Sequence, residues 1–152
     1  MSPDVMSPDA VTGGCLCGAV RLRAALPPNW VAHCHCSMCR RAHGAGFVTW
    51  VGFPRDAVTI ESGGERLTRF QSSAQATRSF CSRCGSMLLF QSGRWPDETH
   101  LTLACLDSAE GLEPQVHAYW SSRAPWADWS ARELPTMDPP DHGGDVAPPS
   151  AG

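Results

Sequence analysis

The residues best suited to chemistry in this sequence lie in one short stretch, residues 33–41, which reads His-Cys-His-Cys-Ser-Met-Cys-Arg-Arg. Cys34, Cys36 and Cys39 fall within six residues, a density typical of metal binding. In an extended chain, residues two apart point to the same side, so Cys34 and Cys36 can face one ion. The gap before Cys39 allows a third sulfur to turn onto that ion. Three thiolates would leave one coordination position open, which is where zinc enzymes do their chemistry.

The histidines near this stretch are weaker candidates for ligands. If the first two cysteines face the metal from an extended strand, His33 and His35 project to the opposite side. His43 follows Cys39 by four residues, on a predicted short helical turn. It is therefore an alternative fourth ligand, and it would close the site.

Two further cysteine pairs have metal-binding spacing. Cys15 and Cys17 form a second Cys-x-Cys flanked by glycines, and Cys81 and Cys84 form Cys-x-x-Cys-Gly, as in a zinc knuckle. Joining the two pairs gives a closed four-cysteine site, which would add folding energy. Spacing also permits other partitions, such as one that joins the first two cysteines of residues 33–41 to the knuckle. Cys105 lies among apolar residues, which favours a buried apolar role over a ligand role.

Composition and charge narrow the possible partners. The chain has 152 residues, 42% of them hydrophobic and 18% charged, which predicts one small globular domain. All twelve basic residues are arginine, and the formal net charge is −3. Seven metal-bound thiolates would add −7 and two Zn²⁺ ions +4, which moves the charge from −3 to −6. Nucleic acid is therefore not an expected partner.

The expected location follows from the segments that the sequence lacks. No apolar run approaches about 18 residues, so we expect no membrane span. The first residues have no basic region followed by an apolar run, so we expect no signal peptide. A reducing, cytoplasmic compartment is expected, in which the cysteines stay free to bind metal.

Short runs of alternating or β-branched residues between turn signals predict an all-β domain, with no long helical period. Residues 1–12 are expected to form a flexible tail, residues 13–135 the domain, and residues 136–152 a disordered tail rich in Pro and Gly. The predicted strands cover residues 19–26, 30–36, 47–53, 58–60, 67–70, 76–80, 87–90, a segment around 101–103, and 116–120.

Together these motifs resemble the glutathione-dependent formaldehyde-activating (GFA) family, which is related to centromere protein V. The resemblance runs from about residue 13 to residue 135. The matching motifs are Gly14-Cys15-Leu16-Cys17-Gly18, then Cys34-x-Cys36-x-x-Cys39-Arg40 with Gly44 close behind, Arg78-x-Phe80-Cys81-x-x-Cys84-Gly85, Leu106-Asp107, His117 and Pro125-Trp126.

The resemblance implies a β-tent fold that binds two zinc ions and acts as a carbon–sulfur lyase on the adduct of glutathione and formaldehyde. It also divides the cysteines between a structural zinc and an exchangeable catalytic zinc that takes a substrate thiol. The matching positions are Cys15, Cys17, Cys81 and Cys84 for the structural zinc, and Cys34, Cys36 and Cys39 for the catalytic zinc. The two tails, Cys105 and the many tryptophans depart from the family pattern, so the natural thiol and aldehyde stay open.

The resulting hypothesis is a zinc-dependent lyase for an adduct such as S-hydroxymethylglutathione. Arg40 is the predicted contact for a substrate carboxylate, as is Arg41, and Trp50 is a predicted pocket wall. The alternatives are surface charges for the arginines and a core role for Trp50. Two other classes of function compete: a zinc-stabilised interaction module without catalysis, and a zinc-handling protein.

Overall fold

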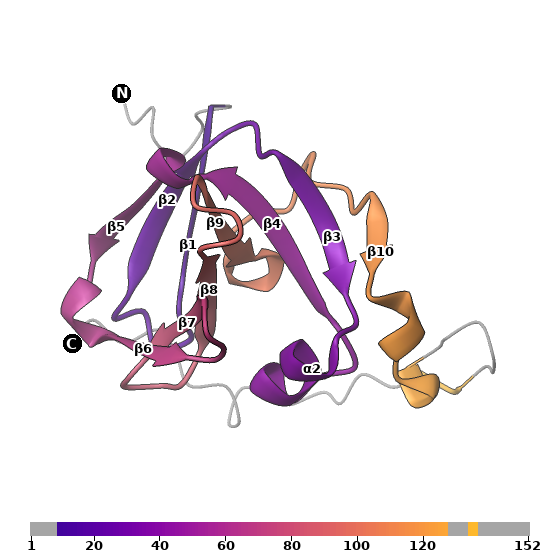
Figure 1. Cartoon of the computed structure of the whole chain (residues 1–152). Helices are drawn as coiled ribbons and strands as arrows, with labels where there is room; N and C mark the ends of the chain where they lie inside the picture. The colour runs from indigo at the N-terminus through magenta and orange to yellow at the C-terminus, as the bar shows by residue number, and fades with distance from the viewer. Residues whose placement is uncertain (1–8, 128–133, 137–152) are drawn as a thin grey trace.

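The computed structural model describes residues 9–127 and 134–136, and it contains two β-sheets (Figure 1). The small sheet has three strands in the order β1-β2-β5, and the large sheet has seven in the order β10-β3-β4-β9-β8-β7-β6. All neighbouring strands are antiparallel except β10 and β3, which are parallel. The strands are β1 (Ala10–Gly14), β2 (Arg21–Ala25), β3 (Trp30–Cys34), β4 (Val48–Pro54), β5 (Val58–Ser62), β6 (Leu67–Gln71), β7 (Ala76–Cys81), β8 (Met87–Ser92), β9 (Glu98–Thr102) and β10 (Val116–Ala118).

Helical structure is limited to short segments, so the all-β prediction is confirmed. The one α-helix of the described residues is α2 (Ser37–His43), which lies beside the ends of β3 and β4 (Figure 1). The 3₁₀ helices are η1 (Arg55–Ala57), η2 (Gly64–Arg66), η3 (Leu103–Cys105), η4 (Trp120–Ser122) and η5 (Pro125–Ala127). Within the described ranges, none of the helices has the length and apolar character needed to cross a bilayer.

Two boundaries differ from the sequence prediction. Strand β1 starts at Ala10 and pairs with β2, so residues 10–12 belong to the small sheet and not to a tail. Its five residues end in two glycines and therefore gave little strand signal. Strand β3 ends at Cys34, because Cys36 is already the N-cap of α2. Residues 1–8 and 137–152 of the predicted tails lie outside the described residues.

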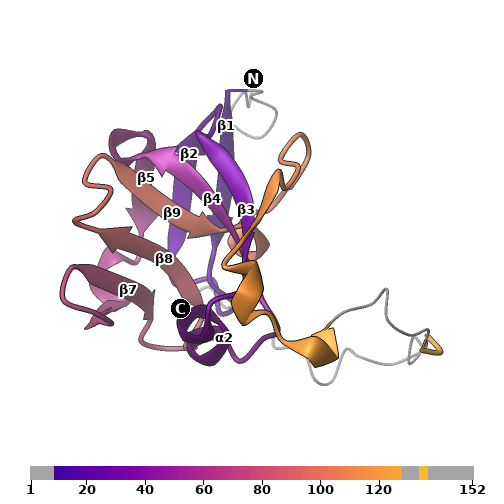
Figure 2. The same cartoon turned by 45° about the vertical axis from the view of Figure 1, so that its right-hand side comes forward.

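The large sheet has two different faces, because side chains alternate along each strand. Buried apolar residues such as Val51, Phe53 and Leu101 lie on one face and form a core with Val11 and Leu22 of the small sheet. Figure 2 shows β3, β4, β9, β8 and β7 following one another across the large sheet. The core holds the strands in position through one face of the large sheet. The side chains of the other face are therefore not needed for this packing.

The second face carries a row of four aligned residues on neighbouring strands. Trp30 pairs with Gly52, Gly52 with His100, and His100 with Phe90, across β3, β4, β9 and β8. The side chains of Trp30, His100 and Phe90 therefore point to the same side of the sheet, and Gly52 leaves space between them. Cys39 of α2 lies on this same side of the sheet.

Among the described residues, Phe53 is the largest of the fully buried side chains, and its loss should leave a cavity in the core between the sheets. We expect Phe53→Ala to lower the free energy of unfolding by about 3–5 kcal/mol. Phe70→Ala, which removes a side chain that is 61% exposed on β6, should change it by less than about 0.5 kcal/mol. Urea unfolding of the zinc-loaded variants measures both values, and equal effects would contradict this account of the core.

Candidate metal centres and the adjoining cavity

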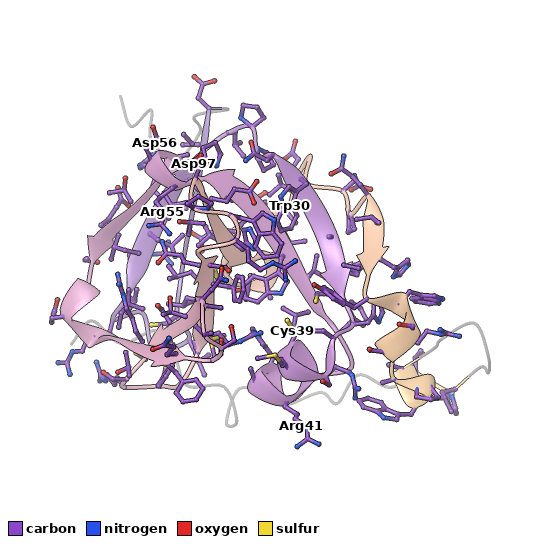
Figure 3. All side chains as sticks on the ribbon, viewed as in Figure 1. Trp30, Cys39, Arg41, Arg55, Asp56 and Asp97 are labelled. Carbon is purple, nitrogen blue, oxygen red and sulfur yellow. The ribbon has the colours of Figure 1, made fainter. Side chains whose placement is uncertain are left out.

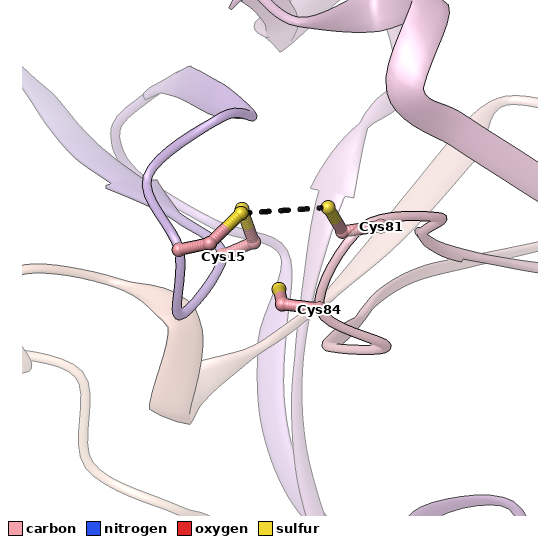
Figure 4. A group of neighbouring side chains, drawn as sticks. Cys15, Cys81 and Cys84 are labelled. Carbon is pink, nitrogen blue, oxygen red and sulfur yellow. Dashed lines mark hydrogen bonds between the residues drawn. The ribbon is translucent and has the colours of Figure 1, made fainter. Parts of the chain in front are cut away.

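The first candidate metal centre is the four-sulfur cluster of Cys15, Cys17, Cys81 and Cys84. The first pair lies in the turn between β1 and β2, and the second pair comes from the end of β7 and the turn that follows. Figure 4 shows Cys15 facing Cys81 and Cys84. All four sulfurs lie within 4.8 Å of one another, with 3.6 Å between Cys15 and Cys17 and 3.9 Å between Cys17 and Cys81. Zinc–sulfur bonds of about 2.3 Å in a tetrahedron place sulfurs about 3.8 Å apart, so the residues fit a zinc ion.

Hydrogen-bond donors around the four-sulfur cluster favour thiolates. The backbone N–H of Val20 donates to the Cys15 sulfur at 3.2 Å, and that of Arg83 to the Cys81 sulfur at 3.4 Å. Burial acts to raise the pKa of Cys84, but hydrogen bonds from Ser86 lower it to about 6. Donors aimed at sulfur stabilise the charged form that a metal requires.

The knuckle that carries Cys84 turns at Gly85. Gly85 has a φ of +81° and donates its N–H to the Cys81 carbonyl oxygen at 2.7 Å. A residue with a side chain would be strained in this left-handed conformation. The glycine therefore allows the tight turn that brings the two sulfurs of the knuckle together.

The second candidate centre is the three-sulfur cluster of Cys34, Cys36 and Cys39, whose sulfurs also lie within 4.8 Å of one another. Cys34 ends β3, Cys36 caps α2, and Cys39 lies in the first turns of that helix. As the cap, the Cys36 sulfur accepts a hydrogen bond from the Cys39 N–H at 3.3 Å. Hydrogen bonds from Cys34 and Cys39 lower the pKa of Cys36 to about 2, and contact with Cys36 raises the pKa of Cys34. One thiolate is thus already favoured here, as in a metal site.

Two buried side chains donate to the sulfur of Cys39. The indole N–H of Trp50 lies 3.4 Å from it, and the guanidinium nitrogens of Arg78 lie 3.6 and 3.7 Å from it. Arg78 is only 4% exposed, and the ion pairs of the described residues do not include it. Because a guanidinium stays charged, an uncompensated one would be costly here. The Cys39 sulfur, which would be a thiolate with a metal bound, is therefore placed to balance its charge.

Sequence reasoning did not assign Arg78 to this site. It was named there only as the first residue of a motif shared with the family. Its signal in the sequence is that it is the one charged residue of Ala76–Cys81, a strand with four buried residues out of six. A lone arginine in a buried strand needs an anionic partner, but only the tertiary structure shows that this partner is a cysteine sulfur.

The neighbouring histidines lie outside the three-sulfur cluster. His33 and His35 pack around His117, and His35 Nε2 lies 2.9 Å from His117 Nδ1. His43 places its ring edge-on to Trp50, and burial lowers its pKa to about 4. In the part of the chain that the structure describes, no histidine or carboxylate joins the three sulfurs.

A cavity of about 550 Å³ opens beside the three-sulfur cluster. All three cysteines line it, and Trp30 and Cys39 point into this central space from β3 and α2 (Figure 3). Six of the wall residues carry aromatic rings or imidazole. These are Trp30, Trp50, Phe90, Trp95, His100 and Tyr119.

The predicted substrate contacts have different positions. Trp50 lines the cavity and is 5% exposed, so it belongs both to the wall and to the packed interior. Arg40 does not line the cavity, and its Nε atom is buried without a hydrogen-bond partner in the described structure. Arg41 projects outward from α2 (Figure 3). The arginines that line the cavity are instead Arg78 and Arg94.

Cys105, the eighth cysteine, belongs to neither cluster. It is half-buried in η3 against the core between the sheets, and burial raises the pKa of its thiol. A wider groove of about 1230 Å³ runs past Cys105 and His43 but is not lined by the three-sulfur cluster. That cluster therefore opens onto the smaller cavity.

The family model described as glutathione-dependent formaldehyde-activating enzyme (GFA) matches residues 10–122 of this chain. The chain belongs to the GFA family. Halomonas elongata has a relative named "Putative glutathione-dependent formaldehyde-activating enzyme", which is 33% identical over 80% of this chain and 82% of its own length. A Schizosaccharomyces pombe protein named as an uncharacterized lyase is 33% identical over 51% of this chain and 55% of its own length.

A solved structure has a similar fold. The crystal structure of a Rhodobacter sphaeroides protein matches with a TM-score of 0.59 and 27% sequence identity. The match covers 70% of this chain and 99% of that chain. The described fold is therefore one that is also found by experiment.

If the Arg78 guanidinium compensates the charge on Cys39, removing it should weaken metal binding at the three-sulfur cluster. We expect Arg78→Met to weaken zinc binding there by about 10- to 100-fold, since groups that bond to metal ligands have effects of this size. Competition with a coloured zinc chelator measures the affinity.

Arg69→Met is the matched control, because Arg69 is exposed on the neighbouring strand β6. It should leave both zinc affinities unchanged. An Arg78→Met protein that holds both ions as tightly as the parent would show that Arg78 only packs against its surroundings.

Proposed function

We propose that this protein is a carbon–sulfur lyase that forms or cleaves a thiol–aldehyde adduct such as S-hydroxymethylglutathione. The observation that carries the proposal is a cluster of three sulfurs that lines a cavity, with no further protein ligand from the described residues. Membership of the GFA family and the names of the relatives support glutathione as the thiol and formaldehyde as the aldehyde. The relative named as a lyase supports the reaction class.

The two clusters have separate roles in this proposal. The four-sulfur cluster would hold a structural zinc, since all four ligand positions are filled by the protein. Cys34, Cys36 and Cys39 would hold the second zinc, which when bound supplies a position for the substrate thiol and lowers the pKa of that thiol.

The reaction needs no redox partner. In the direction of synthesis the thiol sulfur attacks the aldehyde carbon, a carbon–sulfur bond forms, and the electron pair of the carbonyl bond moves to oxygen. The proton lost from the thiol ends on that oxygen. Cleavage reverses each change and releases the aldehyde.

The chain contributes charge balance and a fixed geometry to the site. Three thiolates with one Zn²⁺ carry a charge of about −1, which suits a soft thiol ligand better than a strong Lewis acid would. The guanidinium of Arg78 offsets this charge within a largely apolar wall, where electrostatic interactions are strong. Trp50 fixes the position of the Cys39 sulfur through its N–H donor. These contacts hold the site in one geometry before substrate arrives.

Cobalt substitution separates the two roles. We expect glutathione to change the visible spectrum of only one of the two bound Co²⁺ ions, that of the three-sulfur cluster. Cys39→Ser should remove this response and the exchange of formaldehyde with S-hydroxymethylglutathione, measured by NMR, while the protein stays folded. Cys84→Ser should instead lower stability, because it breaks the closed cluster.

Two results would count against the lyase. If glutathione changes the spectrum of neither Co²⁺ ion, a zinc-stabilised interaction module would be favoured. An equal loss of folding stability in Cys39→Ser and Cys84→Ser would show that both clusters stabilise the fold. Cys105→Ser is the control, since Cys105 lies in neither cluster and should leave both readouts unchanged.

A further inference from the structure

We propose that the cavity beside the three-sulfur cluster selects an adduct whose carbonyl-derived carbon bears an aromatic or similarly large apolar group. The preferred aldehyde would then be far larger than formaldehyde. This inference rests on the proposed function, because it assumes that a thiol–aldehyde adduct is bound at Cys34, Cys36 and Cys39. It concerns the part of the adduct that the family name does not determine for this chain.

The size of the cavity is the first argument. Its volume of about 550 Å³ lies in the range of sites for drug-sized ligands. Formaldehyde has two heavy atoms and fills about as much space as two water molecules, roughly 60 Å³. Most of the cavity therefore remains for other parts of the substrate.

The second argument is the position of the aromatic wall, by which we mean the rings of Trp30, Trp50, Phe90, Trp95 and His100. It starts at the reacting centre, because the Trp50 indole donates to the Cys39 sulfur. From Trp50 the rings continue to Phe90, with centroids 5.9 Å apart, and from Phe90 to His100, stacked at 5.5 Å. Trp95 extends the wall from His100, at 5.6 Å. A group carried by the carbon next to the bound sulfur would thus meet aromatic rings first.

The wall is held in place before any ligand binds. Glu98 accepts hydrogen bonds from His100 Nε2 at 2.9 Å and from Trp30 Nε1 at 3.3 Å. The Trp30 ring lies directly over Gly52, where any Cβ atom would collide with the indole. Both rings are therefore fixed by their edges, which leaves apolar surface toward the cavity. A rigid wall lowers the entropic cost of binding an aromatic guest.

The charged groups of the cavity are the third argument. Glu98 is already bonded to the wall, and Arg78 is bonded to Cys39 and lies over the Phe90 ring at 5.1 Å. Arg94 is exposed and stacks on Trp95 at 4.9 Å. Of the two arginines that line the cavity, the exposed Arg94 is thus the one available to a ligand carboxylate, while Trp50 and His100 of the wall are buried. This arrangement fits a substrate with a charged thiol half outside and an apolar half inside.

A matched pair of thioethers tests this preference. S-benzylglutathione imitates the adduct of glutathione with benzaldehyde, lacking only its hydroxyl group, and S-methylglutathione imitates the adduct with formaldehyde in the same way. We expect the zinc-loaded protein to bind S-benzylglutathione at least about tenfold more tightly, measured by titration calorimetry, because the ring buries apolar surface.

Variants locate the binding in the cavity. Trp95 is 39% exposed at the rim, so Trp95→Ala should fold and should lose at least about threefold of the preference. Trp95→Phe keeps a ring there and should retain most of it. Trp126→Ala removes a tryptophan that is 69% exposed and lines neither cavity, so it should leave the preference unchanged.

Equal affinity for the two thioethers, or no binding of S-benzylglutathione, would overturn the inference. So would a preference that survives in Trp95→Ala or disappears in Trp126→Ala. The cobalt spectra with free glutathione test the proposed function separately, because they require no group on the sulfur. A lyase specific for formaldehyde would pass that test and fail this one.

Discussion

The four-sulfur cluster is the contact on which the rest of the structure depends, because it joins the two sheets at one end. Cys15 and Cys17 belong to the turn of the small sheet, and Cys81 and Cys84 to a turn of the large sheet. A metal ion held there would tie together turns that lie more than sixty residues apart in the chain. If the sheets are joined in this way, the second cysteine cluster would not be needed to hold the fold, as the open position of the proposed function requires.

The large sheet then separates stability from chemistry by its two faces. One face packs Val51, Phe53 and Leu101 into the core, so the strands cannot shift by one residue without exposing them. The same register places Trp30, His100 and Phe90 on the other face, around the cavity. The core thus fixes the positions of the cavity wall without contributing any side chain to it.

The parts of the structure that depend on local sequence could be predicted, and those that depend on strand pairing could not. Cys-x-Cys and Cys-x-x-Cys spacings indicated which neighbouring cysteines could share an ion, though not which pairs join, and the alternating or β-branched runs located every strand except β1. The contact between Arg78 and Cys39 joins β7 to α2, and the spacing of the sequence does not record that pairing. The same holds for the Trp30, Gly52, His100 and Phe90 row, which requires the register of four strands.

Charge explains why Arg78 is more than a packing residue in the proposed reaction. A site with three thiolates and one divalent ion is anionic, and an apolar wall makes any net charge costly. With the ion bound, the guanidinium would bring the total close to zero, so the site could take up the charge of a substrate sulfur once its proton has left. The departing proton is the one that the aldehyde oxygen gains. In the proposed reaction the arginine would therefore lower the cost of the state in which thiol and aldehyde react, and the proposed role of the aromatic wall is to select the aldehyde that reaches it.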